Sequence, residues 1–263
     1  MAYTVIGDEK FLVSATIGAG GSASFDDLSS SPLSATTYNT PTLVSDTTYG
    51  GTHAIKLDNP PTAPNDQYID YPDPTGKCNF ASSSFTMCCW FKQVAYSPSA
   101  NYNAVRFGYG ATNPSTLSDV IPCAMFWNDR NNRFGFKTDG LSNNWKAVNI
   151  NAADDGNWHH VMYHYNGSSK RIYFDGSQVL NQSATGSSTS IVGQVRIGLY
   201  PGSWTGATPY YNGLLDDLRY FDRALTTTEI ASLSSGRTSA PPASGVYNPF
   251  KNNRFNAGNA RVR

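Results

Sequence analysis

The sequence has few charged side chains and almost no glutamate. Charged residues occupy 14% of the 263 positions, against about a quarter in an average protein. Glu9 and Glu229 are the only glutamates among 19 acidic residues, and the remainder are aspartates, which favour turns. Helical proteins usually cover their exposed faces with Lys and Glu. This composition therefore argues against a helical bundle and favours many short strands joined by tight turns.

Membrane spans and targeting signals are also missing from the sequence. No stretch approaches the roughly 20 apolar residues that a membrane span needs. The first residues lack the basic region and apolar run of a secretory signal, so we expect the protein to be intracellular at synthesis. The net charge of zero gives no overall attraction to nucleic acid or to a membrane.

Motifs of metal binding and catalysis are equally scarce. The sequence contains no G-x-S-x-G, no H-E-x-x-H and no phosphate-binding glycine loop. The cysteines show no zinc-ligand spacing, and we expect them to be buried, reduced thiols. They are Cys78, Cys88, Cys89 and Cys123.

Alternation of apolar and polar residues predicts a series of β-strands. In the clearest strand, 85–92, four apolar side chains from Phe85 to Phe91 share one face. We predict strands at 53–57, 67–71, 85–92, 105–109, 124–127, 133–137, 158–165, 171–174, 194–200 and 213–221. Asp175-Gly176 predicts a type I′ hairpin turn. Strands without intervening helices predict two packed antiparallel sheets.

Two ends flank this strand-rich region. We divide the chain into an N-terminal arm (1–19), one domain (20–235) and a basic C-terminal tail (236–263). The apolar run at 11–13 is either part of the arm or an added edge strand. Near the end of the domain, Thr226 and Glu229 have the spacing of a capping box, which predicts one short helix.

The tail carries five basic residues and no acidic one. It has too few apolar residues to fold alone, so we expect it to dock on neighbouring subunits of a homo-oligomer or larger assembly. The alternative is packing against its own domain, and five charges are weak grounds for nucleic-acid binding. The candidate contact residues are Tyr247, Phe250, Lys251, Arg254, Phe255, Arg261 and Arg263.

Three segments resemble the laminin-G-like family of the concanavalin A-like lectin and glucanase superfamily. Segment 85–92 is similar to the family's F-T-x-x-x-W strand, and 157–176 to its W-H-H-V hairpin. Segment 213–230 is similar to its closing D-D-V-R-I-Y-N-R-A-L run. The resemblance covers roughly residues 20–235. It implies an all-β, antiparallel jelly-roll β-sandwich, to which the capping box adds one short C-terminal helix and the two ends add extended terminal arms.

The resemblance also bears on chemistry. Glucanases of this superfamily use paired carboxylates in an E-x-D-x-x-E strand, which is not found here, so we expect no enzymatic activity. Family members often carry calcium on loop oxygens, and a calcium ion needs six to eight oxygen ligands. The calcium candidates are Asp58, Asn65, Asp66 and Asp216. Asp216 is expected on one face with Leu214, Leu218 and Tyr220, and the alternative is that it accepts backbone hydrogen bonds.

Two functions remain open at this point. The first is a structural or assembly protein, such as a virion capsid decoration or fibre component docked through its terminal arms, because laminin-G-like domains occur on virus particles. The alternative is a lectin-like, carbohydrate-binding module for surface attachment. Its candidate ligand-binding residues lie in loop-like segments and are Trp145, Trp204, Tyr210 and Tyr211. We expect Trp90 and Trp158 to pack in the core, and His159 and His160 to point to opposite faces of one strand.

Overall fold

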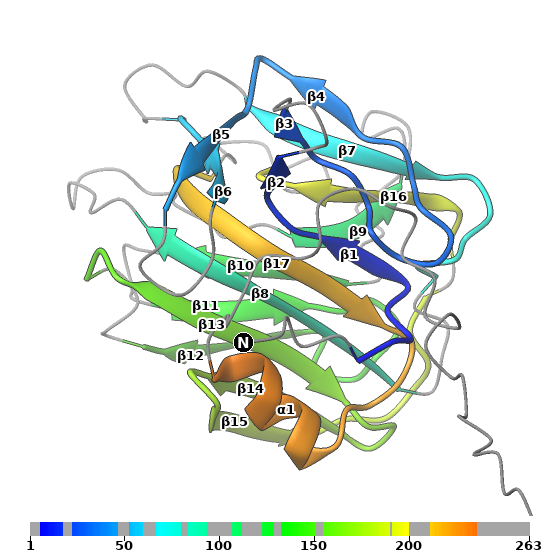
Figure 1. Ribbon diagram of the computed structural model, residues 1–263. Helices are drawn as coiled ribbons and strands as arrows, with labels where there is room; N and C mark the ends of the chain where they lie inside the picture. Colours follow the sequence, from blue (N-terminus) through cyan, green and yellow to red (C-terminus); the bar gives the residue numbers. More distant parts are fainter. Residues whose placement is uncertain are drawn as a thin grey trace, which may run out of the picture.

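Two antiparallel sheets pack face to face in the computed structural model (Figure 1). The structure describes residues 6–17, 23–46, 53–59, 67–79, 84–93, 107–111, 123–128, 133–150, 155–189, 191–199 and 211–235. Within these residues one helix, α1 (Thr227–Ser234), covers part of the outer surface of the larger sheet. The predicted all-β jelly-roll sandwich is thereby confirmed. No helix in these ranges has the length and apolarity of a membrane span.

The larger sheet has eight strands in the order β15-β14-β13-β8-β17-β6-β5, with β1 also beside β17. Its strands are β1 (Phe11–Val13), β5 (Thr42–Ser45), β6 (His53–Leu57), β8 (Phe85–Gln93), β13 (Trp158–Tyr165), β14 (Ser169–Phe174), β15 (Ser177–Ser183) and β17 (Gly213–Phe221). β6 pairs with the first residues of β17 and β1 with its last residues. The segment 11–13 therefore forms a strand of this sheet.

The smaller sheet has seven strands in the order β12-β11-β10-β9-β16-β7-β4. Its strands are β4 (Thr36–Tyr38), β7 (Tyr68–Asp73), β9 (Phe107–Ala111), β10 (Cys123–Asn128), β11 (Arg133–Lys137), β12 (Trp145–Asn149) and β16 (Gly193–Ile197). A separate two-stranded ribbon is formed by β2 (Thr16–Ile17) and β3 (Ala23–Ser24).

The main core lies between the two sheets and is rich in aromatic rings. Alternate residues of β8, from Phe85 to Phe91, point into it, as the sequence predicts. Across the sandwich, the rings of Phe136 and Tyr163 stack with centroids 3.6 Å apart. Such rings bury large apolar areas, so this layer fixes how the two sheets face each other.

A second apolar cluster lies under helix α1, on the outer face of the eight-stranded sheet. Met162 and Tyr173 on the sheet pack with Ile230 and Leu233 of the helix. The predicted capping box is confirmed, because Glu229 N donates to Thr226 Oγ1 and Thr226 N donates to Glu229. The helix therefore begins where the sequence predicts and covers this part of the sheet.

Two sequence expectations about side-chain direction are corrected. Trp90 is buried, but on the outer face of the eight-stranded sheet, with its ring 5.2 Å from that of His160. Trp158, also expected in the core, is partly exposed. In β17 the alternation breaks at a bulge between Asp216 and Arg219. Leu215, and not Leu214, therefore shares the core with Leu218, because a bulge adds a residue to one strand.

Candidate functional site

Several strands of both sheets begin or end at one end of the sandwich, which we call the loop end. Gly213, the first residue of β17, lies opposite Leu57 at the end of β6 and Gln93 at the end of β8. In the other sheet, Ile197 at the end of β16 lies opposite Ile69 and Phe107, near the starts of β7 and β9. The ends of β6, β8 and β16 and the starts of β7, β9 and β17 therefore lie at this end.

Asn59 holds three parts of the loop end together. Its Nδ2 donates to the carbonyls of Gln67 (2.9 Å) and Tyr211 (2.8 Å), and its Oδ1 accepts from Gln67 N (2.8 Å). Its own N–H donates to Asn212 Oδ1. A buried amide with all of these partners gives the surrounding loops a fixed base. Sequence reasoning missed Asn59, because two of its partners, Tyr211 and Asn212, are distant in the sequence.

Three stacked side chains and the carboxylate that binds the last of them reach the surface beside the loop end, on the outer face of the seven-stranded sheet. The rings of Tyr38 and Tyr68 are parallel, with centroids 4.2 Å apart. The guanidinium of Arg196 lies 5.1 Å from the Tyr68 ring, and Asp70 accepts from its Nε (2.6 Å) and Nη2 (2.8 Å). We call Tyr38, Tyr68, Asp70 and Arg196 the tyrosine–arginine ladder.

The ladder combines an exposed ring with a buried, neutralised ion pair. Tyr38 is 38% exposed, whereas Arg196 and Asp70 are buried. A two-pronged guanidinium–carboxylate contact fixes both side chains, and the guanidinium in turn supports the face of Tyr68. The result is a rigid aromatic surface backed by a buried ion pair.

Of the four predicted ligand residues, the structure describes Trp145 and Tyr211, and these two lie in different parts of the sandwich. Tyr211, predicted as a candidate ligand-binding residue, is buried, and its hydroxyl donates toward the carbonyls of Lys92 and Leu214, so its ring is not exposed to a ligand. Trp145 begins β12 instead of lying in a loop, and it is 44% exposed. It occupies the sheet edge opposite to Tyr38. Trp204 and Tyr210 lie outside the described residues.

The predicted calcium residues are placed in part. Asp216 is buried and accepts from Ser14 Oγ, Ala15 N and Asp217 N, so protein donors surround it, as the alternative reading expected. Asp58 lies 3.8 Å from the ammonium of Lys56. Within the described ranges, no three His, Cys, Asp or Glu side chains form a metal-binding group. Asn65 and Asp66 fall outside those ranges.

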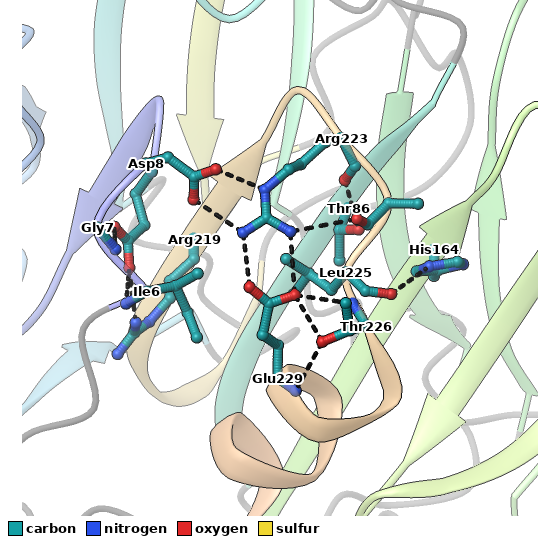
Figure 2. Close-up of polar contacts among 12 residues, drawn as sticks. Ile6, Gly7, Asp8, Thr86, His164, Arg219, Arg223, Leu225, Thr226 and Glu229 are labelled. Atoms are coloured by element: carbon teal, nitrogen blue, oxygen red, sulfur yellow. Dashed lines mark hydrogen bonds and ion pairs between the residues drawn. The ribbon is translucent and has the colours of Figure 1, made fainter.

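The N-terminal segment is fastened to its own domain by charged residues. Arg223 lies between Asp8 and Glu229, with its Nη2 2.7 Å from Glu229 (Figure 2). Glu9 accepts from Arg219, and Lys10 pairs with Asp222. Residues 6–17 therefore pack against their own domain, which is the alternative to docking on a neighbouring subunit. The seven candidate residues of the C-terminal tail lie outside the described residues, and its docking stays a prediction.

His159 is held between two carboxylates at the loop end. Its Nδ1 lies 2.8 Å from Asp175 and its Nε2 3.0 Å from Asp155. Burial alone would lower the pKa of His159, but the hydrogen bonds to the two aspartates outweigh it and raise the pKa above 6.5. Burial would raise the pKa of Asp155, but hydrogen bonds from Asn157 and His159 lower it to about 2. The site is therefore an ion-pair cluster that clamps β13 to the β14–β15 turn.

Replacing His159 with glutamine is expected to destabilise the protein more at pH 6 than at pH 9. The folded pKa lies above the unfolded value of 6.5, so the charged ring adds stability that is complete below pH 6.5. That stability is lost as the pH rises through the folded pKa. Urea unfolding of both proteins at the two pH values measures the difference. Titration of His159 below pH 6.5 by NMR would contradict the prediction.

Two facing antiparallel sheets, with a core of alternating apolar residues between them, define a lectin-like β-sandwich. A family model described as the Concanavalin A-like lectin/glucanases superfamily, Laminin_G_3, matches residues 63–231. The chain belongs to this family. No curated protein matches the sequence.

Several solved structures share the fold. The binding domain of Paraclostridial Mosquitocidal Protein 1 matches 86% of this chain and 52% of its own, at 14% identity and a TM-score of 0.59. The binding domain of botulinum neurotoxin serotype G matches 86% and 50%, at 15% identity and a TM-score of 0.57. The serotype D domain, in complex with N-acetylneuraminic acid, matches 87% and 50%, at 11% identity and a TM-score of 0.57. The chain thus spans about half of these structures, and the likeness shows the fold.

Proposed function

We propose that this protein is a non-enzymatic, carbohydrate-binding module that holds glycans on the tyrosine–arginine ladder. The observation that carries the proposal is the exposed ring of Tyr38, stacked on Tyr68 and backed by the Arg196–Asp70 pair. A sugar ring offers an apolar face to an aromatic ring and hydroxyl groups to polar neighbours. The ladder supplies the aromatic contact, on a ring that Tyr68 and the buried Arg196–Asp70 pair hold in place.

The positions of the two glutamates support binding over catalysis. Glycoside hydrolysis needs two carboxylates flanking the scissile bond. Glu9 is bound to Arg219, and Glu229 to Arg223 and the start of helix α1. Hydrogen bonds from Arg223 lower the pKa of Glu229 to about 2, so this carboxyl group is not a proton donor near neutral pH. Both glutamates thus have structural partners.

A glycan array, run with and without calcium, tests the proposal. We expect Tyr38→Ala to weaken binding of the recognised glycan by roughly tenfold or more, because an aromatic anchor carries a large share of such contacts. Tyr38→Phe keeps the ring and should keep most of the affinity.

Trp145→Ala is the matched control for Tyr38→Ala. Trp145 is an equally exposed aromatic residue at the opposite edge of the same sheet. The Trp145→Ala variant should leave glycan affinity unchanged if the tyrosine–arginine ladder is the binding site. An array without any signal, or loss of binding in Trp145→Ala alone, would show that the proposal is wrong.

A further inference from the structure

Strand β15 ends the eight-stranded sheet and pairs only with β14 in the described part of the chain. Five of its seven residues are exposed, so its second edge faces solvent. The backbone N–H and C=O groups along such an edge bind readily to a strand of another chain. Proteins usually block these edges with charged residues, with proline or by keeping the strand very short.

Of the four strands that end the two sheet orders, β15 is the least protected. β4 has three residues and β5 has four, and Pro41 lies just before β5. β12 carries Lys146. β15 has seven residues, without a charge or a proline. A register shift near the β14–β15 turn leaves Val179 without an opposite residue, and the residues after it pair regularly with β14.

The sequence of β15 reads almost the same in both directions. The strand begins and ends with serine, has a glutamine next to each end, and has Leu180 at its centre. Only Val179 and Asn181, on either side of Leu180, break the symmetry. In an antiparallel pair with a two-fold axis at Leu180, each residue lies opposite the mirrored position of the other copy. Serine then lies opposite serine, and glutamine opposite glutamine.

The side chains of β15 suit such a pairing with themselves. A glutamine amide both donates and accepts hydrogen bonds, and serine hydroxyl groups pair across strands. The amides have only long contacts within the chain: Gln178 Oε1 lies 3.5 Å from the Tyr173 hydroxyl, and Gln182 Nε2 lies 3.4 Å from the Ser183 carbonyl. A two-fold axis would also bring like charges together, and this strand has no charged residue.

Pairing at β15 leaves the tyrosine–arginine ladder accessible. β15 lies on the same side of the sandwich as β12, because a bridge joins Leu141 to Gly186 and Ser142 N donates to the Thr185 carbonyl. The ladder includes β4, at the opposite end of the seven-stranded sheet from β12 (Figure 1). The free edge of β15 and the ladder are therefore separate surfaces.

We propose that β15 pairs antiparallel with β15 of a second copy of this chain, about a two-fold axis at Leu180. The eight-stranded sheets of the two copies then form one continuous sheet. Seven residues a side are fewer than the roughly 20 to 30 of a stable interface, so the dimer is weak and reversible. A dilution series in sedimentation velocity should give a dissociation constant of about 10 to 100 μM.

Charge substitutions at the two asymmetric positions test both the edge and the register. The proposed register places Val179 of each copy opposite Asn181 of the other, and both residues are exposed. Val179→Lys combined with Asn181→Lys puts like charges opposite each other twice, and should weaken the dimer by roughly tenfold. High salt should relieve part of this repulsion. Val179→Lys combined with Asn181→Asp pairs opposite charges and should restore the dimer.

Thr42→Lys combined with Ser45→Lys is the matched control, because both residues are exposed on β5, the opposite edge of the same sheet. It adds the same charge and should leave the dimer unchanged, with every variant folded by circular dichroism. A single chain at about ten times the expected dissociation constant would overturn the inference. So would a dimer that resists the two lysines on β15, that the aspartate variant fails to restore, or that the control weakens equally. None of these results bears on carbohydrate binding.

Discussion

Arg219→Met is expected to lower the free energy of unfolding by about 3 to 5 kcal/mol at pH 7. Arg219 is fully buried and donates to Asp217 through Nε and Nη2, and to Glu9 through Nη1 at 3.0 Å. Both carboxylates are buried as well. Methionine would leave two buried negative charges without their cation, and their desolvation would no longer be offset. Urea unfolding followed by tryptophan fluorescence measures the loss.

Arg223→Met is the matched control for Arg219→Met. Arg223 also joins two acids, Asp8 and Glu229 (Figure 2), but its side chain is 33% exposed. Exposed pairs contribute at most about 1 kcal/mol. The loss at Arg219 should also shrink in a triple variant that adds Glu9→Gln and Asp217→Asn. Equal losses in the two single variants would show that burial does not govern these ion pairs.

The strands that could be predicted from the sequence are those that face the core. The predicted bounds of β6, β11, β13 and β17 match the structure residue for residue. Their apolar residues recur at every second position because one face of each strand is buried. The turn at Asp175-Gly176 has positive φ at both residues, 47° and 79°, as a type I′ turn requires.

The strands that sequence reasoning missed lie at sheet edges. β4, β5 and β12 have no fully buried residue within their bounds, so they need no alternation of apolar residues. Their strand character comes from hydrogen bonds to a neighbour, which a single sequence does not display. Tyr38 and Trp145 both fall in such strands, which is why the first was missed and the second was assigned to a loop.

The candidate site could not be predicted for a related reason. Tyr38, Tyr68 and Arg196 are far apart in the chain and meet only because β7 lies between β4 and β16. That order is a property of the jelly-roll topology. Tyr211 has polar neighbours in sequence that suggest a loop, but it is buried and its N–H donates to the Gly198 carbonyl. The local pattern shows which residues form strands, and the sheet order decides which of them meet.

Alternation within one strand gives two adjacent histidines opposite electrostatic environments. His159 points to two carboxylates, and its pKa is raised. His160 points to the other face, where burial lowers its pKa to about 4. Asp217 and Asp175 act against that decrease, and Arg219 adds to it. Its Nδ1 finds no partner in the described part of the chain, so a proton there would be buried without an acceptor.

His160→Leu is therefore expected to protect the protein from mild acid. The unfolded chain binds a proton at this residue near pH 6.5 and the folded chain near pH 4. Above pH 6.5 the neutral His160 has its full stabilising effect. As the pH falls from 6.5 to 4, the unfolded chain takes up a proton that the folded chain does not, and the free energy of unfolding decreases. Below pH 4 both states are protonated and the contribution of His160 no longer changes. The decrease amounts to about 3 kcal/mol in the unmodified protein. The His160→Leu variant should not show this loss of stability on acidification. Urea unfolding of both proteins at pH 7, 5.5 and 4.5 measures the difference.

His159 does not obscure the comparison, because its raised pKa makes its contribution complete below pH 6.5. His164→Leu should act in the same direction as His160→Leu, since burial lowers the pKa of His164 too. It also removes the hydrogen bond from Nε2 to the Leu225 carbonyl, 3.1 Å away, so it should reduce stability at every pH. Parallel acid curves for the unmodified protein and His160→Leu would show that His160 is already protonated, or solvated, in the folded state.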